Sequence, residues 1–374
     1  MKILHTSDWH LGAMAGDRSL YEDQKFYIDQ IADIVKEENI DCILICGDVY
    51  DRSVASKEAI GLYDYAMTKL CLEKGIPVLV IAGNHDSAER LSSCRELLSK
   101  SGLYVEGSLK REVSKVSFED TDIYLLPWIT EEKVKSVFPE EKENIDSLED
   151  AYSVVTRHIK EGFEEGKKNI LSAHAFITSA DTSTSDRAAE TGFAPQVGSF
   201  VFDGFDYVAL GHIHKPQDIG ENIRYSGTPM PYSFGKEEVQ KKSVTVIDTA
   251  DMSRSLVPLK LLNRRKTLKG TLEEILNTSG DEREGYVRLE ITDSYAGQEV
   301  LFLLREKFPG LLEIKGKTFE GEESTITVSI DEFEKLSENP VEVFRRFCTE
   351  QMNMEPDSHL VSLFEKAVAG EELK

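Results

Sequence analysis

The chain has no long hydrophobic run, few cysteines and no excess of positive charge. No apolar stretch approaches the roughly 20 residues that cross a membrane, and residues 2–7 have a strand pattern without the apolar core of a signal peptide. The five cysteines are odd in number and have no C-x-x-C spacing, so we expect reduced thiols and not a disulfide framework. These absences predict a cytoplasmic protein that is neither secreted nor embedded in a membrane.

The missing positive charge bears on nucleic-acid binding. The formal net charge is -24 at pH 7, whereas proteins that bind nucleic acid through their whole surface are usually basic. Taken alone, this acidity argues against DNA. A pair of divalent cations held by only two aspartates can still leave a crevice positive, so the net charge restricts the surface and not a local site.

The length of 374 residues predicts two or three domains. Residues 1–105 alternate strands with amphipathic helices, an order that favours an α/β fold with a parallel sheet and right-handed crossovers. A first domain is expected over residues 1–262, and residues 263–266 are a candidate linker. A small α+β domain should follow over residues 267–332, and a helix pair over residues 338–374.

The hydrophobic periodicity predicts the elements of these parts. The expected helices span residues 21–38, 57–74, 88–100 and 147–165, and the expected early strands span residues 2–7, 41–46, 76–82, 123–126, 169–172 and 207–210. Residues 223–225, 243–248 and 256–261 are expected to complete the layer of strand 207–210, after a polar loop at 178–192. The small domain should hold strands 286–291, 311–314 and 325–329 and a helix at 298–308.

Polar groups follow five of the apolar runs directly, at the point where each predicted strand ends. An open α/β sheet holds its ligand at the carboxyl ends of its strands. The five motifs are Asp8-Trp9-His10, Gly47-Asp48, Gly83-Asn84-His85-Asp86, Ala173-His174 and Gly211-His212-Ile213-His214. The seven candidate metal ligands among them are Asp8, His10, Asp48, Asn84, His174, His212 and His214.

Oxygen and imidazole donors without thiolate suit Mn²⁺, Fe or Zn²⁺, and two Asp, one Asn and four His are enough for two ions. Asp48 is a candidate bridge between the ions. A two-metal centre activates water and stabilises the entering and leaving oxygens of a displacement at phosphorus. His85, next to Asn84, is then free to donate a proton to the leaving alkoxide.

The order D-x-H, G-D, G-N-H-D, H and G-H-x-H resembles the calcineurin-like metallophosphoesterase superfamily over about residues 1–260. Within it, residues 3–12, 83–87, 202–214 and 225–229 resemble the bacterial SbcD nuclease family, the counterpart of the Mre-type nucleases of double-strand-break repair. The resemblance implies a four-layer metallophosphoesterase core with a small α+β accessory domain and a C-terminal helix pair.

The same resemblance implies a Mn²⁺-dependent DNA nuclease subunit, with Mg²⁺ or Fe as alternative metals. Such a subunit acts as an exonuclease on double-stranded ends and as an endonuclease on single strands and hairpins, in DNA repair, replication and recombination. The family forms a homodimer that works with the coiled-coil ATPase SbcC. By this analogy residues 267–332 position DNA, and residues 338–374 grip the base of the coiled coil.

Residue by residue, the resemblance implies one metal at Asp8, His10, Asp48 and His214, and the other at Asp48, Asn84, His174 and His212. It assigns the catalytic role to His85. Archaeal and eukaryotic relatives have a second active-site histidine where this chain has Asp51, as SbcD proteins do, so the role of Asp51 stays open.

Several side chains also have plainer interpretations. Arg52 and Arg90 are candidate DNA contacts, but in so acidic a chain they equally suit ion pairs. Asp86 is expected to orient a neighbouring histidine and not to bind metal itself. His5 suits the core, and His158 suits a helix surface.

Two rival functions stay open. Another two-metal phosphodiesterase acting on nucleotides would share the motifs, although it would not need the C-terminal third of the chain. A non-catalytic scaffold subunit could keep the metal site for folding alone, although the intact His85 and the full ligand set argue against it.

Overall fold

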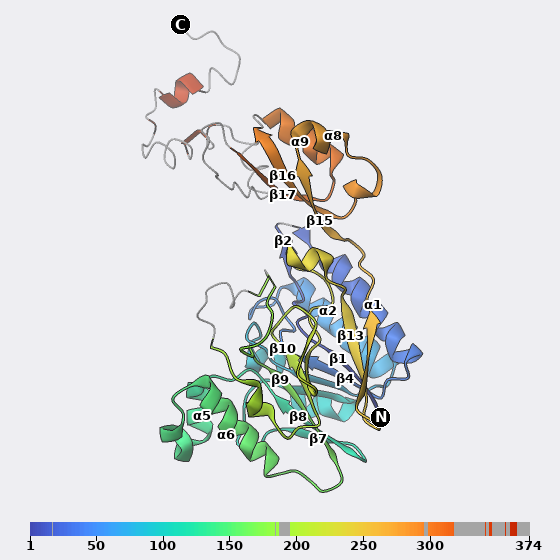
Figure 1. Cartoon of the computed structure of the whole chain (residues 1–374), viewed down its shortest axis with the longest axis vertical. Helices are drawn as coiled ribbons and strands as arrows, with labels where there is room; N and C mark the ends of the chain where they lie inside the picture. Colours follow the sequence, from blue (N-terminus) through green and yellow to red (C-terminus); the bar gives the residue numbers. More distant parts are fainter. Residues whose placement is uncertain are drawn as a thin grey trace. The chain divides into compact units, whose positions relative to one another are not determined.

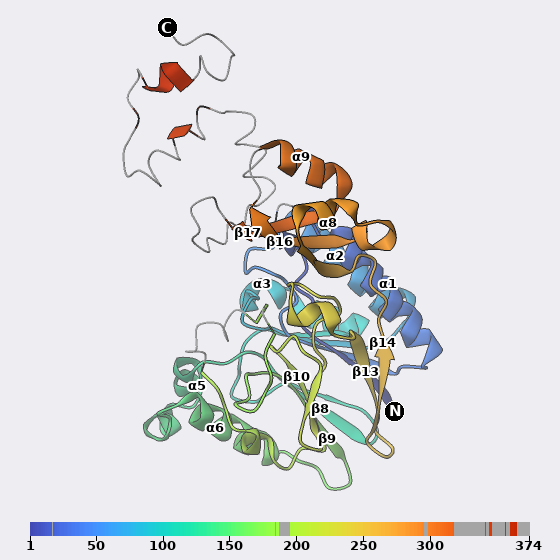
Figure 2. The same cartoon turned by 45° about the horizontal axis from the view of Figure 1, so that its top comes forward.

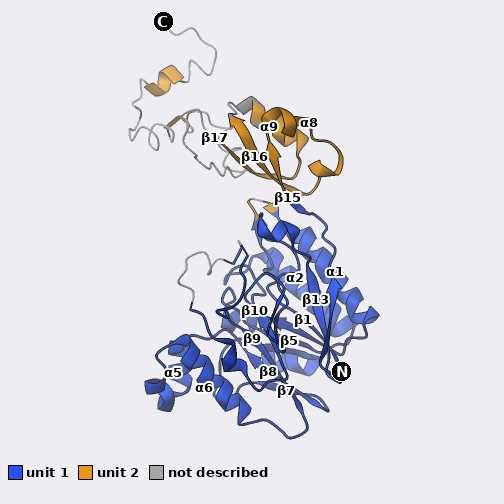
Figure 3. Cartoon of the chain, viewed as in Figure 1, with its two compact units in different colours: residues 1–14, 19–266 blue, residues 15–18, 267–374 orange. Residues whose placement is uncertain are grey.

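The computed structural model describes residues 1–16, 18–183, 185–186, 195–294, 298–317, 341, 344–345, 356 and 360–364. The chain divides into two compact units (Figure 3): Met1–Met14 with Ser19–Lys266, and Ala15–Arg18 with Thr267–Lys374. The expected strand at 325–329 and most of the helix pair at 338–374 lie outside the described residues. The three-part division of the chain therefore stays a prediction.

The first sheet of unit 1 has six strands, and its central four are parallel, as the β-α-β-α-β order predicts. Its order is β14-β13-β1-β4-β5-β6. These strands are β1 (Lys2–Thr6), β4 (Cys42–Cys46), β5 (Val78–Ile81), β6 (Leu103–Glu106), β13 (Ser243–Asp248) and β14 (Ser253–Pro258). The parallel strands are β1, β4, β5 and β6, and their buried Val, Ile, Leu and Cys residues form the near-continuous apolar runs of strands covered on both faces.

The second sheet also has six strands, in the order β11-β12-β10-β9-β8-β7. They are β7 (Lys115–Ser117), β8 (Thr121–Leu126), β9 (Lys168–His174), β10 (Tyr207–Gly211), β11 (Gln217–Ile219) and β12 (Ile223–Tyr225). β7 and β8 pair antiparallel at the edge of this sheet. The expectation that three late strands complete this layer is wrong, because only β12 joins it; β13 pairs antiparallel with β1 of the first sheet.

Helices cover the outer faces of the two sheets. The described helices of unit 1 are α1 (Tyr21–Glu37), α2 (Lys57–Met67) with the π-helix Thr68–Glu73, α3 (Ala88–Leu91), α4 (Arg95–Leu98), α5 (Glu131–Val137) and α6 (Leu148–Lys160). Figure 1 shows α1 and α2 on the side of β1 and β4, and Figures 1 and 2 show α5 and α6 on the side of β8 and β9. Unit 1 is thus a four-layer α/β sandwich.

The helix expected over residues 88–100 is interrupted. Cys94 has a left-handed backbone (φ 59°) between α3 and α4. Ser92 and Ser93 precede it, and serine side chains compete for backbone hydrogen bonds and favour helix ends over helix interiors. The apolar spacing of Leu91 and Leu97 therefore belongs to two short helices.

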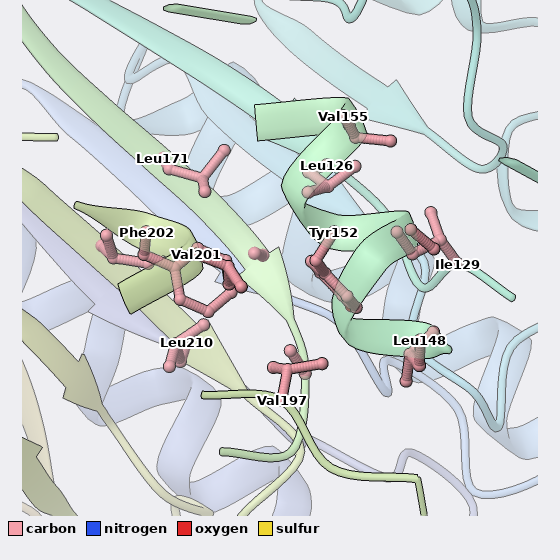
Figure 4. Packing of buried hydrophobic residues seen from close by; sticks show 14 of the residues in the cluster. Leu126, Ile129, Leu148, Tyr152, Val155, Leu171, Val197, Val201, Phe202 and Leu210 are labelled. Atoms are coloured by element: carbon pink, nitrogen blue, oxygen red, sulfur yellow. The ribbon is translucent and has the colours of Figure 1, made fainter. Parts of the chain in front are cut away.

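Two apolar clusters hold the layers together. Alternate side chains of the first sheet, such as Leu44 and Leu79, pack against Ile170 and Ala209 of the second. On the other face of the second sheet, α6 contributes its apolar side to a larger cluster. In Figure 4, Tyr152 of α6 lies among the apolar side chains of this cluster. Its hydroxyl donates a hydrogen bond to the carbonyl of His174 (2.8 Å), so the helix is attached at the end of β9.

Unit 2 contains a three-stranded sheet, β15 (Arg265–Gly270), β16 (Tyr286–Ser294) and β17 (Leu311–Lys317), with helices α8 (Leu272–Asn277) and α9 (Gln298–Lys307). α8 begins with a capping box, in which Thr271 and Glu274 each accept the other's backbone N–H. The predicted linker at 263–266 overlaps the start of β15, because a basic, polar strand at a sheet edge carries no apolar signal.

The remaining described elements are short. They are β2 (Met14–Ala15), β3 (Arg18–Ser19) and the 3-10 turns Ser99–Ser101, Pro139–Asn144, Ser199–Phe202, Lys236–Val239 and Gly280–Arg283. Within the described ranges, no helix has both the length and the apolar character needed to cross a membrane.

Candidate metal centre

The seven candidate ligands converge at one place, where strands of both sheets of unit 1 end. Asp8 and His10 follow β1, Asp48 follows β4, and Asn84 follows β5. His174 ends β9, while His212 and His214 follow β10. Because the parallel strands present their carboxyl ends at one edge, residues more than 200 positions apart in the chain become neighbours.

Asp48 lies at the centre of the group. Its Oδ2 atom is 3.5 Å from His174 Nε2, 3.9 Å from His10 Nε2 and 3.9 Å from His85 Nε2. Its Oδ1 atom accepts the backbone N–H of His85 (2.9 Å). A carboxylate surrounded in this way has the geometry expected of a bridge between two cations.

On one side of Asp48, three donor atoms face each other. Asn84 Oδ1 is 3.0 Å from His174 Nε2 and 2.9 Å from His212 Nδ1. On the other side, His10 Nε2 is 3.1 Å from His214 Nε2. Donor atoms of Asp8, His10 and His214, and of Asp8, Asp48 and His174, lie within 4.8 Å of one another.

The backbone is strained at these positions. Among the described non-glycine residues, seven have positive φ, and four of them are candidate ligands: Asp8 (53°), His10 (44°), Asp48 (50°) and His212 (101°). Such conformations cost free energy and cluster at functional sites. Positive φ is therefore concentrated among the candidate ligands of the described residues.

Glycines allow the loops to approach each other closely. A Cβ on Gly83 would lie 2.1 Å from Asp48 Oδ1, and a Cβ on Gly47 would lie 2.3 Å from His174 Nδ1. A Cβ on Gly211 would lie 1.9 Å from the Cys46 carbonyl oxygen. The glycines of the motifs therefore leave the space that neighbouring groups of the site occupy.

Asp86 has a different role from the one expected. Its carboxylate accepts the backbone N–H groups of Val49 (3.1 Å), Tyr50 (2.9 Å) and Gly83 (2.8 Å). The described structure shows it tying the loop after β4 to the loop after β5, and not orienting a histidine ring. Burial and the nearby Asp48 raise the pKa of Asp86 to about 6, against the opposing effect of these hydrogen bonds.

The electrostatics of the cluster favour positive charge. Burial by itself would raise the pKa of Asp48, but His174 and the other histidines hold it well below its ordinary value. Burial would lower the pKa of His174, but Asp48 and Asp8 raise it to about 9. Burial and His174 lower the pKa of His212 to about 3. The ionised carboxylate of Asp48 thus lies among imidazoles that cannot all be protonated, an arrangement that favours a bound cation.

The donor set fits divalent metal. Asp8, Asp48, His174, His212 and His214 are buried, with 0 to 7% of their surface exposed. Burial of so many polar donors is costly unless a cation or proton compensates them. Carboxylate, amide oxygen and imidazole ligands suit Mn²⁺, Fe or Zn²⁺. The cluster therefore fits divalent metal, as the strand-end motifs predict. The assignment of individual ligands stays a proposal.

His85 differs from the histidines of the ligand set because it is accessible. Its side chain is 19% exposed. Its Nδ1–H donates to the carbonyl oxygen of Asp51 (2.9 Å), because a carbonyl can only accept. The Nε2 atom is therefore the nitrogen turned toward the site.

The two candidate DNA contacts lie near the site and on the surface. Arg52 has a 75% exposed side chain, with Nε 3.5 Å from Asp51 Oδ2. Arg90 donates to the carbonyl of Ser53 (3.1 Å). The ion pair of Arg52 agrees with the plainer interpretation, while contact of either arginine with DNA stays a prediction.

His5 and His158 are placed as the sequence predicts. His5 is fully buried between Tyr207 Oη (3.0 Å) and the Leu210 carbonyl (3.1 Å). His158 lies on α6 with its ring stacked on Phe138.

Several polar side chains around His214 were not predicted from the sequence. The backbone N–H of His214 donates to Asp186 Oδ1 (2.9 Å), and Ser185 Oγ bridges His214 Nδ1 and Glu237. The buried Lys242 lies beside them and donates to the His214 carbonyl (3.2 Å). These residues stand in no motif and are far apart in sequence, so no local signal could identify them.

Trp128 is also absent from the predicted site residues. Its ring stacks on that of His212, with centroids 5.3 Å apart. Trp128 comes two residues after β8, and its position after a strand end is a signal that could have identified it.

Comparisons with known proteins place this arrangement among phosphoesterases. Residues 1–216 match the family model described as calcineurin-like phosphoesterase. Residues 262–352 match the SbcD C-terminal domain model, described as type 5 capsule protein repressor C-terminal domain.

Several solved structures also resemble the chain. GAP50, described as the anchor in the inner membrane complex of Plasmodium, is 11% identical, with a TM-score of 0.40 over 70% of this chain and 89% of that one. The protein TT1561 of Thermus thermophilus is 12% identical, with a TM-score of 0.40 over 69% of this chain and 99% of that one. A dimetal phosphatase from Danio rerio is 12% identical, with a TM-score of 0.40 over 66% of this chain and 91% of that one.

Proposed function

The chain belongs to the SbcD nuclease family of the calcineurin-like phosphoesterases, and from this membership we propose that it is the Mn²⁺-dependent DNA nuclease subunit of an SbcCD-type complex. It cleaves phosphodiesters as an exonuclease at double-stranded ends and as an endonuclease on single strands and hairpins. It serves DNA repair, replication and recombination. Mg²⁺ and Fe are the alternative metals.

One observation carries the proposal: the other six candidate ligands gather around Asp48 in one cluster of oxygen and imidazole donors. In the proposed assignment, Asp8, His10, Asp48 and His214 hold one cation, and Asp48, Asn84, His174 and His212 hold the other. When bound, the cations supply Lewis acidity that activates water and offsets charge at phosphorus. The chain's own contribution is to hold the donors rigidly on strained, buried backbone.

His85 is the proposed catalytic residue. With its Nδ1–H bound to the Asp51 carbonyl, the ring presents Nε2 to the site. A proton carried on Nε2 of the imidazolium form can pass to the leaving alkoxide oxygen, and the neutral ring then keeps the Nδ1–H hydrogen bond. Partial exposure lets a substrate reach this side chain, whereas Asp48 and His174 are buried.

The proposed partner is an SbcC-type ATPase with a coiled coil. The support is the C-terminal family match and the apolar residues spaced along 338–374. Among the described residues of that segment, Phe344 and Phe364 stack with ring centroids 4.3 Å apart. Residues 267–332 are proposed to position DNA.

A second copy of the chain is the other proposed partner. The candidate dimer face is formed by the helical segments 57–74 and 88–100, which carry the exposed apolar side chains Ile60 (54%), Leu72 (64%) and Leu97 (66%). Exposed apolar side chains of this size suit an interface between proteins.

The test is cleavage of labelled single- and double-stranded DNA and of a small chromogenic phosphodiester by the purified chain. Each substrate is assayed with Mn²⁺, with Mg²⁺ and with chelator. The variant is His85→Ala, and the matched control is His158→Ala, which removes a histidine of α6 outside the donor cluster.

The expected result is Mn²⁺-dependent DNA cleavage that chelator and His85→Ala abolish and His158→Ala preserves, with two bound ions in all three proteins. Rapid turnover of nucleotides or the chromogenic diester without DNA cleavage, even with the ATPase partner added, would favour the small-molecule rival. Full metal content without activity on any substrate would favour the scaffold.

A further inference from the structure

Three histidines of the donor cluster point Nε2 inward and leave Nδ1 as an outer nitrogen, facing away from the cluster. A histidine that binds metal through one nitrogen usually donates its other N–H to a carboxylate or carbonyl, which sets the tautomer and the ring orientation. His174 follows this pattern, since its Nδ1–H donates to the Cys46 carbonyl (2.8 Å). His214 reaches a carboxylate through a hydroxyl: its Nδ1 is hydrogen-bonded to Ser185 Oγ, which in turn donates to Glu237, and Asp186 Oδ1 lies 3.6 Å away.

His10 is the exception. Its Nδ1 atom is buried, and no residue in the described part of the chain gives it a hydrogen bond. The carboxylate that faces it is that of Asp51, whose Oδ1 lies 4.0 Å from this nitrogen. Both side chains are largely buried, with 5% of His10 and 12% of Asp51 exposed.

The backbone holds Asp51 in this position. Its N–H donates to the carbonyl of Leu11 (3.1 Å), the residue that follows His10. Its other carboxylate oxygen, Oδ2, lies 3.5 Å from Arg52 Nε, on the neighbouring residue. Its carbonyl accepts Nδ1–H of His85. The side chain of Asp51 thus faces the candidate ligand His10, and its carbonyl binds the candidate catalytic residue His85.

We propose that Asp51 is a positioning residue, whose carboxylate accepts Nδ1–H of His10 when Nε2 of that ring binds metal, and whose carbonyl orients His85. This inference rests on the proposed function, because it takes His10 as a ligand. The two groups of Asp51 then have separate roles. The carboxylate affects metal affinity through His10, and the carbonyl affects proton donation through His85.

The test compares the full chain with Asp51→Ala, Asp51→Asn and the charge-matched control Asp33→Asn, which removes an exposed carboxylate from α1. Mn²⁺ binding is measured by calorimetry. The protonated nitrogen of His10 is identified in the metal-free protein by long-range ¹H–¹⁵N NMR.

We expect Asp51→Ala to raise the Kd of one of the two Mn²⁺ sites about 10- to 100-fold. Asp51→Asn keeps an acceptor oxygen without the charge, so its effect should be smaller; it also carries the test if Asp51→Ala does not fold. NMR should show the His10 proton on Nδ1 in the unaltered chain and a changed tautomer in Asp51→Ala. His85→Ala should lower the maximal rate without changing either Kd, which separates the two roles.

Equal Mn²⁺ affinity and an unchanged His10 tautomer in Asp51→Ala would overturn the inference and leave the proposed function standing. Three ions in the unaltered chain and two in Asp51→Ala would also overturn it, because Asp51 would then be a ligand. A chain that binds no Mn²⁺ would overturn the proposed function and this inference together.

Discussion

At Gly83, the place of a side chain is already filled by the carboxylate of Asp48. The candidate centre depends on the backbone conformation and the size of individual residues. Four ligand residues have positive φ, and the three motif glycines Gly47, Gly83 and Gly211 leave room for neighbouring groups. A motif glycine is therefore as much a part of the site as the ligand that follows it.

Gly83→Ala should disrupt the centre without unfolding the chain. A Cβ on Gly83 would lie 2.1 Å from Asp48 Oδ1 and 2.3 Å from the Asp48 backbone nitrogen, so the proposed bridging carboxylate and the loop backbone that carries it must both shift. We expect Mn²⁺ affinity to fall at least about tenfold. Calorimetric titration with Mn²⁺ measures the change, and circular dichroism verifies the fold.

The control is Gly61→Ala. Gly61 lies within α2, where a Cβ would meet no heavy atom within 4 Å. This variant should bind Mn²⁺ normally and be more stable by about 0.5–1 kcal/mol in urea unfolding, because alanine favours a helix. Normal Mn²⁺ binding by Gly83→Ala would contradict the proposed position of the bridge.

At the scale of elements, the edge of the second sheet depends on a buried acid. Asp122 of β8 has a fully buried side chain that accepts hydrogen bonds from Lys115 of β7 (2.8 Å) and from Lys167 (3.0 Å), the residue before β9. Burial by itself would raise the pKa of Asp122, but the two lysines hold it below its ordinary value. One carboxylate thus joins three consecutive segments of the sheet.

This arrangement predicts a pH dependence. Because the pKa of Asp122 is lower in the folded chain, its ionised form contributes stability above the ordinary aspartate pKa, and this contribution is lost as pH falls through the folded value. Asp122→Asn should reduce the free energy of unfolding by about 1–3 kcal/mol at pH 7, and the difference should shrink below about pH 4.

Urea unfolding at several pH values measures this difference. Asp120→Asn is the control, since Asp120 is an exposed acid in the β7–β8 turn and its replacement keeps an acceptor for Thr121 Oγ1. A difference for Asp122→Asn that does not change between about pH 7 and about pH 3.5 would show that its charge is not responsible.

At the scale of the whole molecule, the candidate centre and the proposed partner site fall in different units. All seven candidate ligands and His85 belong to unit 1, whereas residues 338–374 belong to unit 2. Chemistry and partner binding should therefore be separable.

Deletion of residues 338–374 should abolish co-purification with an SbcC-type ATPase and leave metal-dependent cleavage of a small diester intact. Affinity purification of the co-expressed pair and a diester assay measure the two properties. The opposite pattern, association retained and diester cleavage lost, would place the partner site elsewhere.

The sequence by itself determined most of the elements that depend on local periodicity and the seven candidate ligands of the site. The parallel order of β1, β4 and β5 follows from alternating strands and helices, and the ligands follow from polar groups at five strand ends. Both signals are short-range, because a strand and the motif that ends it are adjacent in the chain.

Only the tertiary structure decided which distant segments meet. β13 pairs with β1 across more than 200 residues, and Glu237 reaches His214 through Ser185. Asp51 acquires its place beside His10 because the carbonyl of Leu11 accepts its backbone N–H. These contacts arise from the pairing and packing of strands and from the close approach of their loops. Contacts between distant segments produce no periodic pattern within either segment, so the sequence alone does not reveal them.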